Sequence, residues 1–407
     1  MPHPILIIPG IGGSVLVKNG AEKKRLFKEH VIDNRWMNIA PLSHERMSLW
    51  RHDNAAVLRR DAVSGVPIGI SQVEQGIRAL PGIEGVCNMV PEFELLARPY
   101  QDLLNHKFNY KYFGGFVDAA LSTGHYEKNK NLQALPYDFR RVLDPHYREE
   151  LFYDMKRAVE SQGRPVVIVG HSLGAVLFKW FLTEKVDERW AERHVRRFFV
   201  VNAPFGGSNT ALKAVMSGEY FVPIFSKKFH SSLQLNGGII MCFPNSYGYL
   251  PHEPLAIVGG DVGDVRDVIT SDVIAERGLS GGGGPEAPEA FEAWRALYHP
   301  HMDTIMDPIR VPTHVVTCAP VLDTLKMFRM REVAGGDVAA AEETAHEPGD
   351  GQVSARSLGV AFSLFDASCM MQTTIDGCHH INIVGDPRFA RLVLDDALDA
   401  LDALGGA

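Results

Sequence analysis

The sequence predicts an α/β fold in which helices cover both faces of a mostly parallel central sheet. Short runs of β-branched and other apolar residues alternate with longer stretches of helical periodicity. Such runs are typical of strands that are buried on both faces of a parallel sheet. The predicted strands are Ile5–Ile8, Val166–Val169, Phe198–Val201 and His314–Thr317. The chain has 407 residues, and we expect one domain over residues 1–407.

Two helices are predicted around this sheet. Residues Ala175–Asp187 (AVLFKWFLTEKVD) follow the second predicted strand and are expected to pack on the sheet. Residues Pro387–Leu404 begin with proline, carry apolar residues at helical spacing and precede two glycines. Two long stretches, at about 18–123 and 218–298, interrupt the alternation. We interpret both as insertions that form a cap over the C-terminal edge of the sheet, although excursions with no role in substrate binding are the alternative.

Composition limits the classes of function. The formal net charge is −8, with 41 Lys and Arg against 49 Asp and Glu. This balance gives no reason to expect nucleic acid or an anionic membrane as a partner, whereas neutral lipid stays open. No stretch approaches the roughly 18 apolar residues of a membrane-spanning helix. The N-terminus has no basic region of a signal peptide, and the five cysteines lack metal-type spacing. We therefore expect reduced thiols in a cytoplasmic protein with no metal or organic cofactor.

The strongest motif is Gly170-His-Ser-Leu-Gly174, which lies between an apolar strand and an apolar helix. In this setting the two glycines allow a sharp turn that exposes the hydroxyl of Ser172 above the sheet. The positive end of the following helix favours negative charge at the same point. The motif therefore predicts the nucleophile of an α/β-hydrolase fold.

A serine nucleophile needs a histidine as base and a carboxylate that orients this histidine. In α/β-hydrolases the chain order is serine, acid, histidine. Asp350 lies between two glycines after the fourth predicted strand, and a plain Asp-Gly turn is the alternative interpretation. His379 and His380 follow, and because adjacent side chains point in different directions, we expect only one of them to be the base. They lack the partners of an ordinary metal site.

The glycine-rich stretch Gly10-Ile11-Gly12-Gly13 follows the first predicted strand. In an α/β-hydrolase, the loop after an early strand supplies one N–H of the oxyanion hole, and the residue after the nucleophile supplies the other. These donors would be Ile11 and Leu173. A nucleotide phosphate is the alternative ligand, but the spacing matches neither G-x-G-x-x-G nor a P-loop.

Several blocks resemble the lecithin:cholesterol acyltransferase-like group of α/β-hydrolases, which includes lysosomal phospholipase. They occur in the order of that family along the whole chain, whereas the predicted cap segments resemble it only loosely. The blocks are Ile8-Pro-Gly-Ile-Gly-Gly-Ser-Val-Leu16, Gly124-His-Tyr126, Leu135-Pro-Tyr-Asp-Phe-Arg140, Gly170-His-Ser-Leu-Gly174, Asn202-Ala-Pro-Phe-Gly-Gly-Ser208, Gly349-Asp-Gly-Gln-Val-Ser-Ala-Arg-Ser357 and His380-Ile-Asn-Ile-Val384.

This resemblance implies a triad of Ser172, Asp350 and His380, with structural support from the Tyr-Asp-Phe-Arg block. It places the base at His380, because the family's histidine is followed by an apolar, a polar and two apolar residues. Secreted members close a lid with a disulfide, which is not possible here in the same way because Cys87 is the only cysteine before Cys242. Candidate substrate contacts are Gly12, Trp36 and Trp50, although core packing explains the tryptophans equally well.

We therefore expect a serine-dependent lipid acyl hydrolase or acyltransferase, of the phospholipase A or glycerolipid lipase type. Its partner would be a lipid ester, which it could meet at a membrane or a lipid droplet. One alternative is a carboxylesterase for small soluble esters, and another is a catalytically silent α/β-hydrolase that serves as a binding protein. The oligomeric state, the acyl acceptor and the ester position are left open by the sequence.

Overall fold

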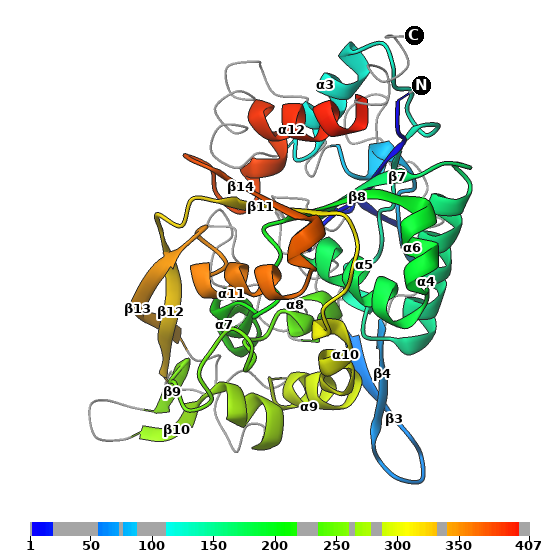
Figure 1. Cartoon of the computed structure of the whole chain (residues 1–407). Coiled ribbons are helices and arrows are strands. Elements are labelled where there is room, and N and C mark those ends of the chain that lie inside the picture. Colours follow the sequence, from blue (N-terminus) through cyan, green and yellow to red (C-terminus); the bar gives the residue numbers. More distant parts are fainter. Residues whose placement is uncertain are drawn as a thin grey trace, which may run out of the picture.

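The computed structural model describes residues 2–18, 56–72, 76–87, 111–217, 235–259, 265–277, 287–331 and 340–398. In this part of the chain the central sheet is parallel and has six strands, in the order β14–β11–β8–β7–β1–β6 (Figure 1). The four strands predicted from the sequence are present as β1 (Ile5–Ile8), β7 (Val166–His171), β8 (Val195–Val201) and β11 (Thr313–Cys318). The edge strands β6 (Leu132–Ala134) and β14 (Met370–Ile375) were not predicted.

Side-chain alternation along the central strands divides the core between the two faces of the sheet. In β1, Leu6 and Ile8 join one buried cluster, while Ile5 and Ile7 join the other. The first cluster includes α4 (Pro145–Glu160) and α5 (Leu173–Glu184), and the second includes α3 (Gly114–Ser122) and α12 (Pro387–Leu398). Helices therefore cover both faces, which confirms the predicted α/β-hydrolase architecture.

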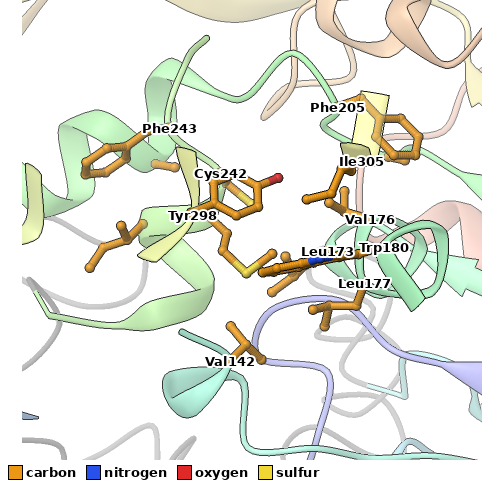
Figure 2. Packing of buried hydrophobic residues seen from close by; sticks show 14 of the residues in the cluster. Val142, Leu173, Val176, Leu177, Trp180, Phe205, Cys242, Phe243, Tyr298 and Ile305 are labelled. Carbon is orange, nitrogen blue, oxygen red and sulfur yellow. The ribbon is translucent and has the colours of Figure 1, made fainter. Parts of the chain in front are cut away.

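Helix α5 is buried at every position from Leu173 to Leu182, so it packs on several neighbours at once. Figure 2 shows part of this core, where side chains of α5, including Trp180, gather in one cluster with Ile305. The helix begins two residues before the predicted start at Ala175, because it follows directly from the turn at Ser172. Helix α12 begins at Pro387 as predicted, and the residues after 398 lie outside the described part of the chain.

A second sheet, which the sequence did not predict, has the strand order β10–β9–β12–β13. Strand β12 departs from strict alternation because its register shifts between Leu325 and Phe328, and β13 is largely exposed. Residues Glu347–Gly349, which precede the predicted acid Asp350, form the end of β13. The strands are β9 (Ala256–Gly259), β10 (Val265–Ile269), β12 (Leu322–Arg331) and β13 (Ala340–Gly349).

The predicted cap insertions are described only in part. In the first, β3 (Ala56–Arg60) and β4 (Pro67–Gln72) form a hairpin that projects from the body of the molecule (Figure 1). From the second, α9 (Ala287–Leu297) packs against β4. Helix α3 falls within the first predicted insertion, but it packs beside α12 on the central sheet. That the remaining segments cover the site stays a prediction.

The other regular elements are short. Among the described residues, no helix has both the length and the hydropathy that crossing a membrane requires. These elements are β2 (Leu16–Lys18), β5 (Ile77–Ala79), α6 (Glu188–His194), α7 (Asn209–Ser217), α8 (Gly237–Met241), α10 (Met302–Met306), α11 (Ala355–Gly359), the π-helix Val273–Arg277 and the 3-10 turns Ile83–Gly85, Phe139–Arg141, His299–His301, Val360–Ser363, Ala367–Cys369 and Asn382–Gly385.

Candidate active site

Ser172 occupies a strained turn between β7 and α5. Its backbone has φ 53° and ψ −126°, a conformation that non-glycine residues seldom adopt. A Cβ on Gly170 would lie 2.8 Å from the Cα of Ala175, and one on Gly174 would lie 2.3 Å from the carbonyl oxygen of Ile8. Only glycine fits at these two positions, which explains the spacing of the motif. The main-chain N–H of Ser172 donates to the carbonyl of Val201 at 2.8 Å and fixes the turn on β8.

The structure brings Ser172, His380 and Asp350 together. The Nε2 atom of His380 lies 2.9 Å from Oγ of Ser172, and its Nδ1 atom lies 2.7 Å from Oδ2 of Asp350. All three side chains are buried, Asp350 completely. With the imidazole neutral, Nδ1–H donates to the carboxylate, and Nε2 accepts the proton of the serine hydroxyl. This is the geometry that activates a serine nucleophile.

Of the two adjacent histidines, His380 is the one that contacts Ser172. The main-chain N–H of His379 donates to Oδ1 of Asn382 at 2.6 Å. Burial of its side chain lowers the pKa of His379. The main-chain N–H of His380 donates to the carbonyl oxygen of Asp350 at 3.0 Å, which joins the base loop to the acid loop.

Asp350 follows directly on the β12–β13 hairpin, so the second sheet positions the acid. Its Oδ1 atom accepts the main-chain N–H groups of Gln352 at 3.0 Å and of Val353 at 2.7 Å. The N–H of Gly351 donates to Oγ1 of Thr324 on β12 at 2.9 Å. These bonds leave Oδ2 of the carboxylate directed at His380.

An ion-pair cluster fixes the chain just beyond the acid. Arg356 donates to both carboxylate oxygens of Glu253, at 2.6 and 2.9 Å, and to Glu347 at 2.7 Å. Its guanidinium also lies over the ring of Tyr249, 4.7 Å from the ring centroid. Such a bidentate contact sets the orientation of the segment as well as its position.

The loop Pro9–Ser14, called the oxyanion loop below, lies against Ser172. A Cβ on Gly10 would be 2.8 Å from Cβ of Ser172, and the N–H of Gly13 closes the turn by donating to the carbonyl of Gly10 at 3.1 Å. Gly12 is buried at φ 71° inside this turn. Within the described part of the chain, the N–H groups of Ile11 and Leu173 donate to no protein acceptor. Trp36 and Trp50, the other candidate substrate contacts, lie outside the described residues.

The Tyr-Asp-Phe-Arg block supports this loop from below. The hydroxyl of Tyr137 donates to the carbonyl of Pro9 at 2.8 Å, and its N–H donates to Oγ of Ser14 at 3.0 Å. Asp138 and Arg140 form a buried ion pair at 2.6 Å. The block contacts the oxyanion loop through Tyr137. Among the described residues, it forms no hydrogen bond with a triad residue.

Three further buried polar residues surround the triad and were given no role from the sequence. Tyr112 and His171 connect the oxyanion loop with the base loop, and Asn202 donates from Nδ2 to the carbonyl of His380 at 3.3 Å. Asn202 also accepts the N–H of Cys318 at 3.0 Å and has φ 46°. The sequence offered two signals, the adjacency of His171 to the nucleophile and the place of Asn202 at the start of the Asn202–Ser208 block; Tyr112 lies in a segment assigned to the cap.

The described residues contain no group of three or more His, Cys, Asp or Glu side chains that could hold a metal ion. The cysteines at 87, 242, 318, 369 and 378 are free thiols. The contacts of His380 with Ser172 and Asp350 allow proton transfer through the imidazole and nucleophilic attack by Ser172.

Residues 101–270 match the family model of lecithin:cholesterol acyltransferase (LCAT). A lysosomal phospholipase A and acyltransferase of Mus musculus is 29% identical over 226 residues, which make up 53% of this chain and 50% of the relative. A phosphatidylcholine-sterol acyltransferase of Papio anubis is 33% identical over 120 residues, 28% of this chain and 26% of the relative. The chain thus matches half or less of the length of these curated relatives.

A solved chain from the crystal structure of the Tle4–Tli4 complex superposes with a TM-score of 0.54 at 12% identity. The match covers 100% of this chain and 99% of that chain. At this identity the likeness concerns the fold alone.

Proposed function

We propose that the chain is an LCAT-like α/β-hydrolase and acts as a serine-dependent lipid acyl hydrolase or acyltransferase. The observation that carries the proposal is the contact of His380 with both Ser172 and Asp350, at 2.9 and 2.7 Å, on a strained turn. The names of the matched relatives, a phospholipase A and acyltransferase and a phosphatidylcholine-sterol acyltransferase, favour lipid esters as substrates.

In the proposed reaction, Oγ of Ser172 attacks the carbonyl carbon of the ester while its proton moves to Nε2 of His380. Asp350 stabilises the imidazolium that forms. The negative charge on the carbonyl oxygen is stabilised by the N–H groups of Ile11 and Leu173. His380 then gives its proton to the leaving alcohol, and an acyl-enzyme on Ser172 remains. Water or a second alcohol attacks this ester and releases the acid or a new ester.

A fluorophosphonate probe tests the nucleophile. We expect it to label wild-type protein at Ser172 and to leave Ser172→Ala unlabelled, with peptide mass spectrometry locating the adduct. A folded wild-type protein that stays unlabelled would support the catalytically silent alternative and overturn the proposal.

A second experiment tests the substrate class. Wild type and Ser172→Ala are incubated with mixed phospholipid vesicles, with and without a long-chain acceptor alcohol, and the products are identified by mass spectrometry. Free fatty acid indicates water as the acceptor, and a new ester indicates the alcohol. Turnover of short soluble esters that falls steeply with acyl length, without release from vesicles, would favour a carboxylesterase.

We also propose that the protein meets its substrate at a neutral lipid surface, through the tip of the β3–β4 hairpin. Val63 at the tip is 97% exposed, and Val66 and Ile68 beside it are 53% and 45% exposed. Apolar side chains that project together from the body of a protein are typical of contact with another apolar surface. The hairpin itself is visible at the lower right of Figure 1.

The backbone of this tip is already hydrogen-bonded, which lowers the cost of entering the headgroup region. The carboxylate of Asp61 accepts the N–H of Val63 at 3.1 Å and the N–H and hydroxyl of Ser64 at 2.8 and 2.9 Å. These bonds lower the pKa of Asp61 and turn its charge toward the turn. The N–H of Asp61 donates to the carbonyl of Val66 at 2.9 Å.

The base of the hairpin is tied to the body by ion pairs. Arg59 contacts Asp144 at 3.1 Å, and Arg60 pairs with Glu292 of α9. With these arginines paired, the tip offers apolar contact rather than positive charge, so zwitterionic lipid suits it better than anionic lipid.

A cytoplasmic location, which we also propose, is supported by the free thiols; fractionation of cells with an antibody against the chain tests it.

A further inference from the structure

A continuous chain of buried hydrogen bonds runs from the oxyanion loop to the base loop. The N–H of Gly10 donates to Oη of Tyr112 at 3.0 Å. Oη of Tyr112 lies 2.6 Å from Nδ1 of His171, and Nε2 of His171 lies 2.8 Å from the carbonyl oxygen of His380. Tyr112 and His171 are each 2% exposed, so water does not compete for these bonds.

The direction of every bond in this chain follows from its ends. The carbonyl of His380 can only accept, so Nε2 of His171 carries a proton and donates it. Burial lowers the pKa of His171 to about 3, which leaves the ring neutral and makes Nδ1 an acceptor. The hydroxyl of Tyr112 therefore donates to Nδ1 while it accepts the N–H of Gly10. With a neutral His171, this assignment of donors and acceptors satisfies every bond of the chain.

Both ends of the chain belong to the proposed catalytic machinery. Gly10 precedes Ile11 in the oxyanion loop and lies against Ser172, where a Cβ would be 2.8 Å from Cβ of Ser172. The carbonyl that closes the other end is that of His380 itself. The ring of His171 also packs on both neighbours, tilted against His380 with the centroids 5.2 Å apart and nearly perpendicular to Tyr112 with the centroids 5.5 Å apart.

We propose that Tyr112 and His171 are positioning residues that hold the oxyanion loop and the base in register with Ser172. The inference rests on the proposed function and deepens it. His171 acts through His380, and Tyr112 acts through Gly10; neither touches the reacting atoms. Removing a bond from this chain should therefore slow the chemical step while leaving substrate binding nearly unchanged, because small misplacements of reacting groups cost rate.

The first test compares Tyr112→Phe with Tyr126→Phe. Tyr126 is also buried and bonds a main-chain carbonyl, that of His3 at 3.1 Å, but at the opposite end of β1. We expect Tyr112→Phe to lower kcat roughly tenfold with KM changed less than about twofold, and Tyr126→Phe to leave both unchanged. Equal effects of the two variants, or an unchanged kcat in folded Tyr112→Phe, would overturn the inference.

The second test separates the two bonds of His171. In His171→Gln the terminal amide can still donate to the carbonyl of His380, whereas His171→Asn is too short to reach it. We expect His171→Gln to retain more kcat than His171→Asn, and His171→Asn combined with Tyr112→Phe to be no slower than His171→Asn alone, since both break one chain. If the losses of kcat in the two single variants add up in the double variant and parallel the fall in thermal midpoint, the role of both residues is purely structural.

A measurement that needs no turnover separates this inference from the proposed function. The ¹⁵N resonances of His171 should show the neutral Nε2–H form from pH 5 to 8, and Tyr112→Phe should shift the Nδ1 resonance. Fluorophosphonate labelling is run on the same samples. If Ser172 is not labelled but the resonances of His171 are as expected, only the proposed function is overturned. If His171 shows the Nδ1–H form or a protonated ring, only the chain of hydrogen bonds is overturned.

Discussion

Gly10 and Ser172 lie so close together that a Cβ on Gly10 would be 2.8 Å from Cβ of Ser172 and 3.1 Å from Nδ1 of His171. Cβ atoms are fixed to the backbone, so the contact with Ser172 cannot be relieved by rotating a side chain. The oxyanion loop is thus held at a separation from the nucleophile that only glycine permits.

Gly10→Ala should therefore displace this loop and lower kcat by about 10²-fold, in the range reported for loss of one oxyanion donor. The matched control is Gly359→Ala, because a Cβ there meets nothing within 4 Å and the backbone has φ −65°. Initial rates with a chromogenic ester and thermal midpoints check both variants. A Gly10→Ala protein with wild-type kcat would contradict the assigned position of the loop.

The choice of base predicts unequal effects at two adjacent positions. His380→Ala should lower kcat by about 10⁴-fold or more, because the serine loses its general base. His379→Ala should lower it less than about tenfold, since the N–H of His379 that contacts Asn382 is retained. Single-turnover labelling rates measure both, and the reverse ranking would reassign the base.

Asp350→Asn should lower kcat by about 10⁴-fold with little effect on KM, because an amide favours the wrong tautomer of His380. Asp366→Asn is the matched control: Asp366 also accepts a main-chain N–H, that of Ser368 at 2.8 Å, but caps a turn outside the triad. Circular dichroism verifies the fold of each variant. Comparable kcat losses in the two variants would show that Asp350 acts only through stability.

Introducing a charge at the hairpin tip should weaken binding to lipid. Val63→Asp places a carboxylate on a side chain that is 97% exposed, so folding is unaffected while transfer to the headgroup region becomes unfavourable. We expect at least about a fivefold loss of binding to phosphatidylcholine vesicles in sedimentation, and unchanged turnover of a soluble short-chain ester. Met371→Asp, on the edge strand β14, serves as the control. Equal binding by wild type and Val63→Asp would exclude the hairpin as the contact.

A buried lysine predicts the pH dependence of stability. Nζ of Lys179 donates to the carbonyls of Ile305 at 2.8 Å and Asp307 at 2.6 Å, and burial lowers its pKa from 10.5 to about 7. Between these values the unfolded chain binds more protons than the folded protein, so the free energy of unfolding rises with pH. The expected slope is at most about 1.4 kcal/mol per pH unit.

Urea unfolding from pH 7 to 10 measures this slope. We expect Lys179→Met to remove it, because methionine does not titrate. The exposed Lys156 on α4 provides the control variant Lys156→Met, in which the slope should persist. Parallel pH profiles of wild type and Lys179→Met would show that Lys179 keeps its proton on folding.

The strands that the sequence predicted are those whose own residues are apolar because both faces of the strand are buried. β1 and β7 are apolar throughout because both faces are covered, and this leaves a continuous signal. β14 is half-exposed at the sheet edge, and β13 pairs, among the strands of the described residues, with the register-shifted β12 alone, so neither carries a clear period. Their positions depend on neighbours distant in the chain.

The same distinction applies to the site. Ser172 has a local signature, because its turn requires glycine on both sides, and the loop motifs of Asp350 and His380 are likewise local. Tyr112 has none: its contacts with Gly10 and His171 join residues 102 and 59 positions away. Hydrogen bonds over such separations leave no pattern in a single sequence, so this part of the site could be found only in three dimensions.

The acid and the nucleophile are carried by different sheets. Ser172 stands at the end of the central strand β7, whereas Asp350 leaves the end of β13, the edge strand of the second sheet. The triad is complete only while the two sheets are docked, and we expect an opening between them to move Asp350 away from Ser172 before either sheet unfolds. The reactivity of Ser172 therefore reports whether the two sheets are docked. It should be lost at a lower denaturant concentration than the helical circular dichroism signal.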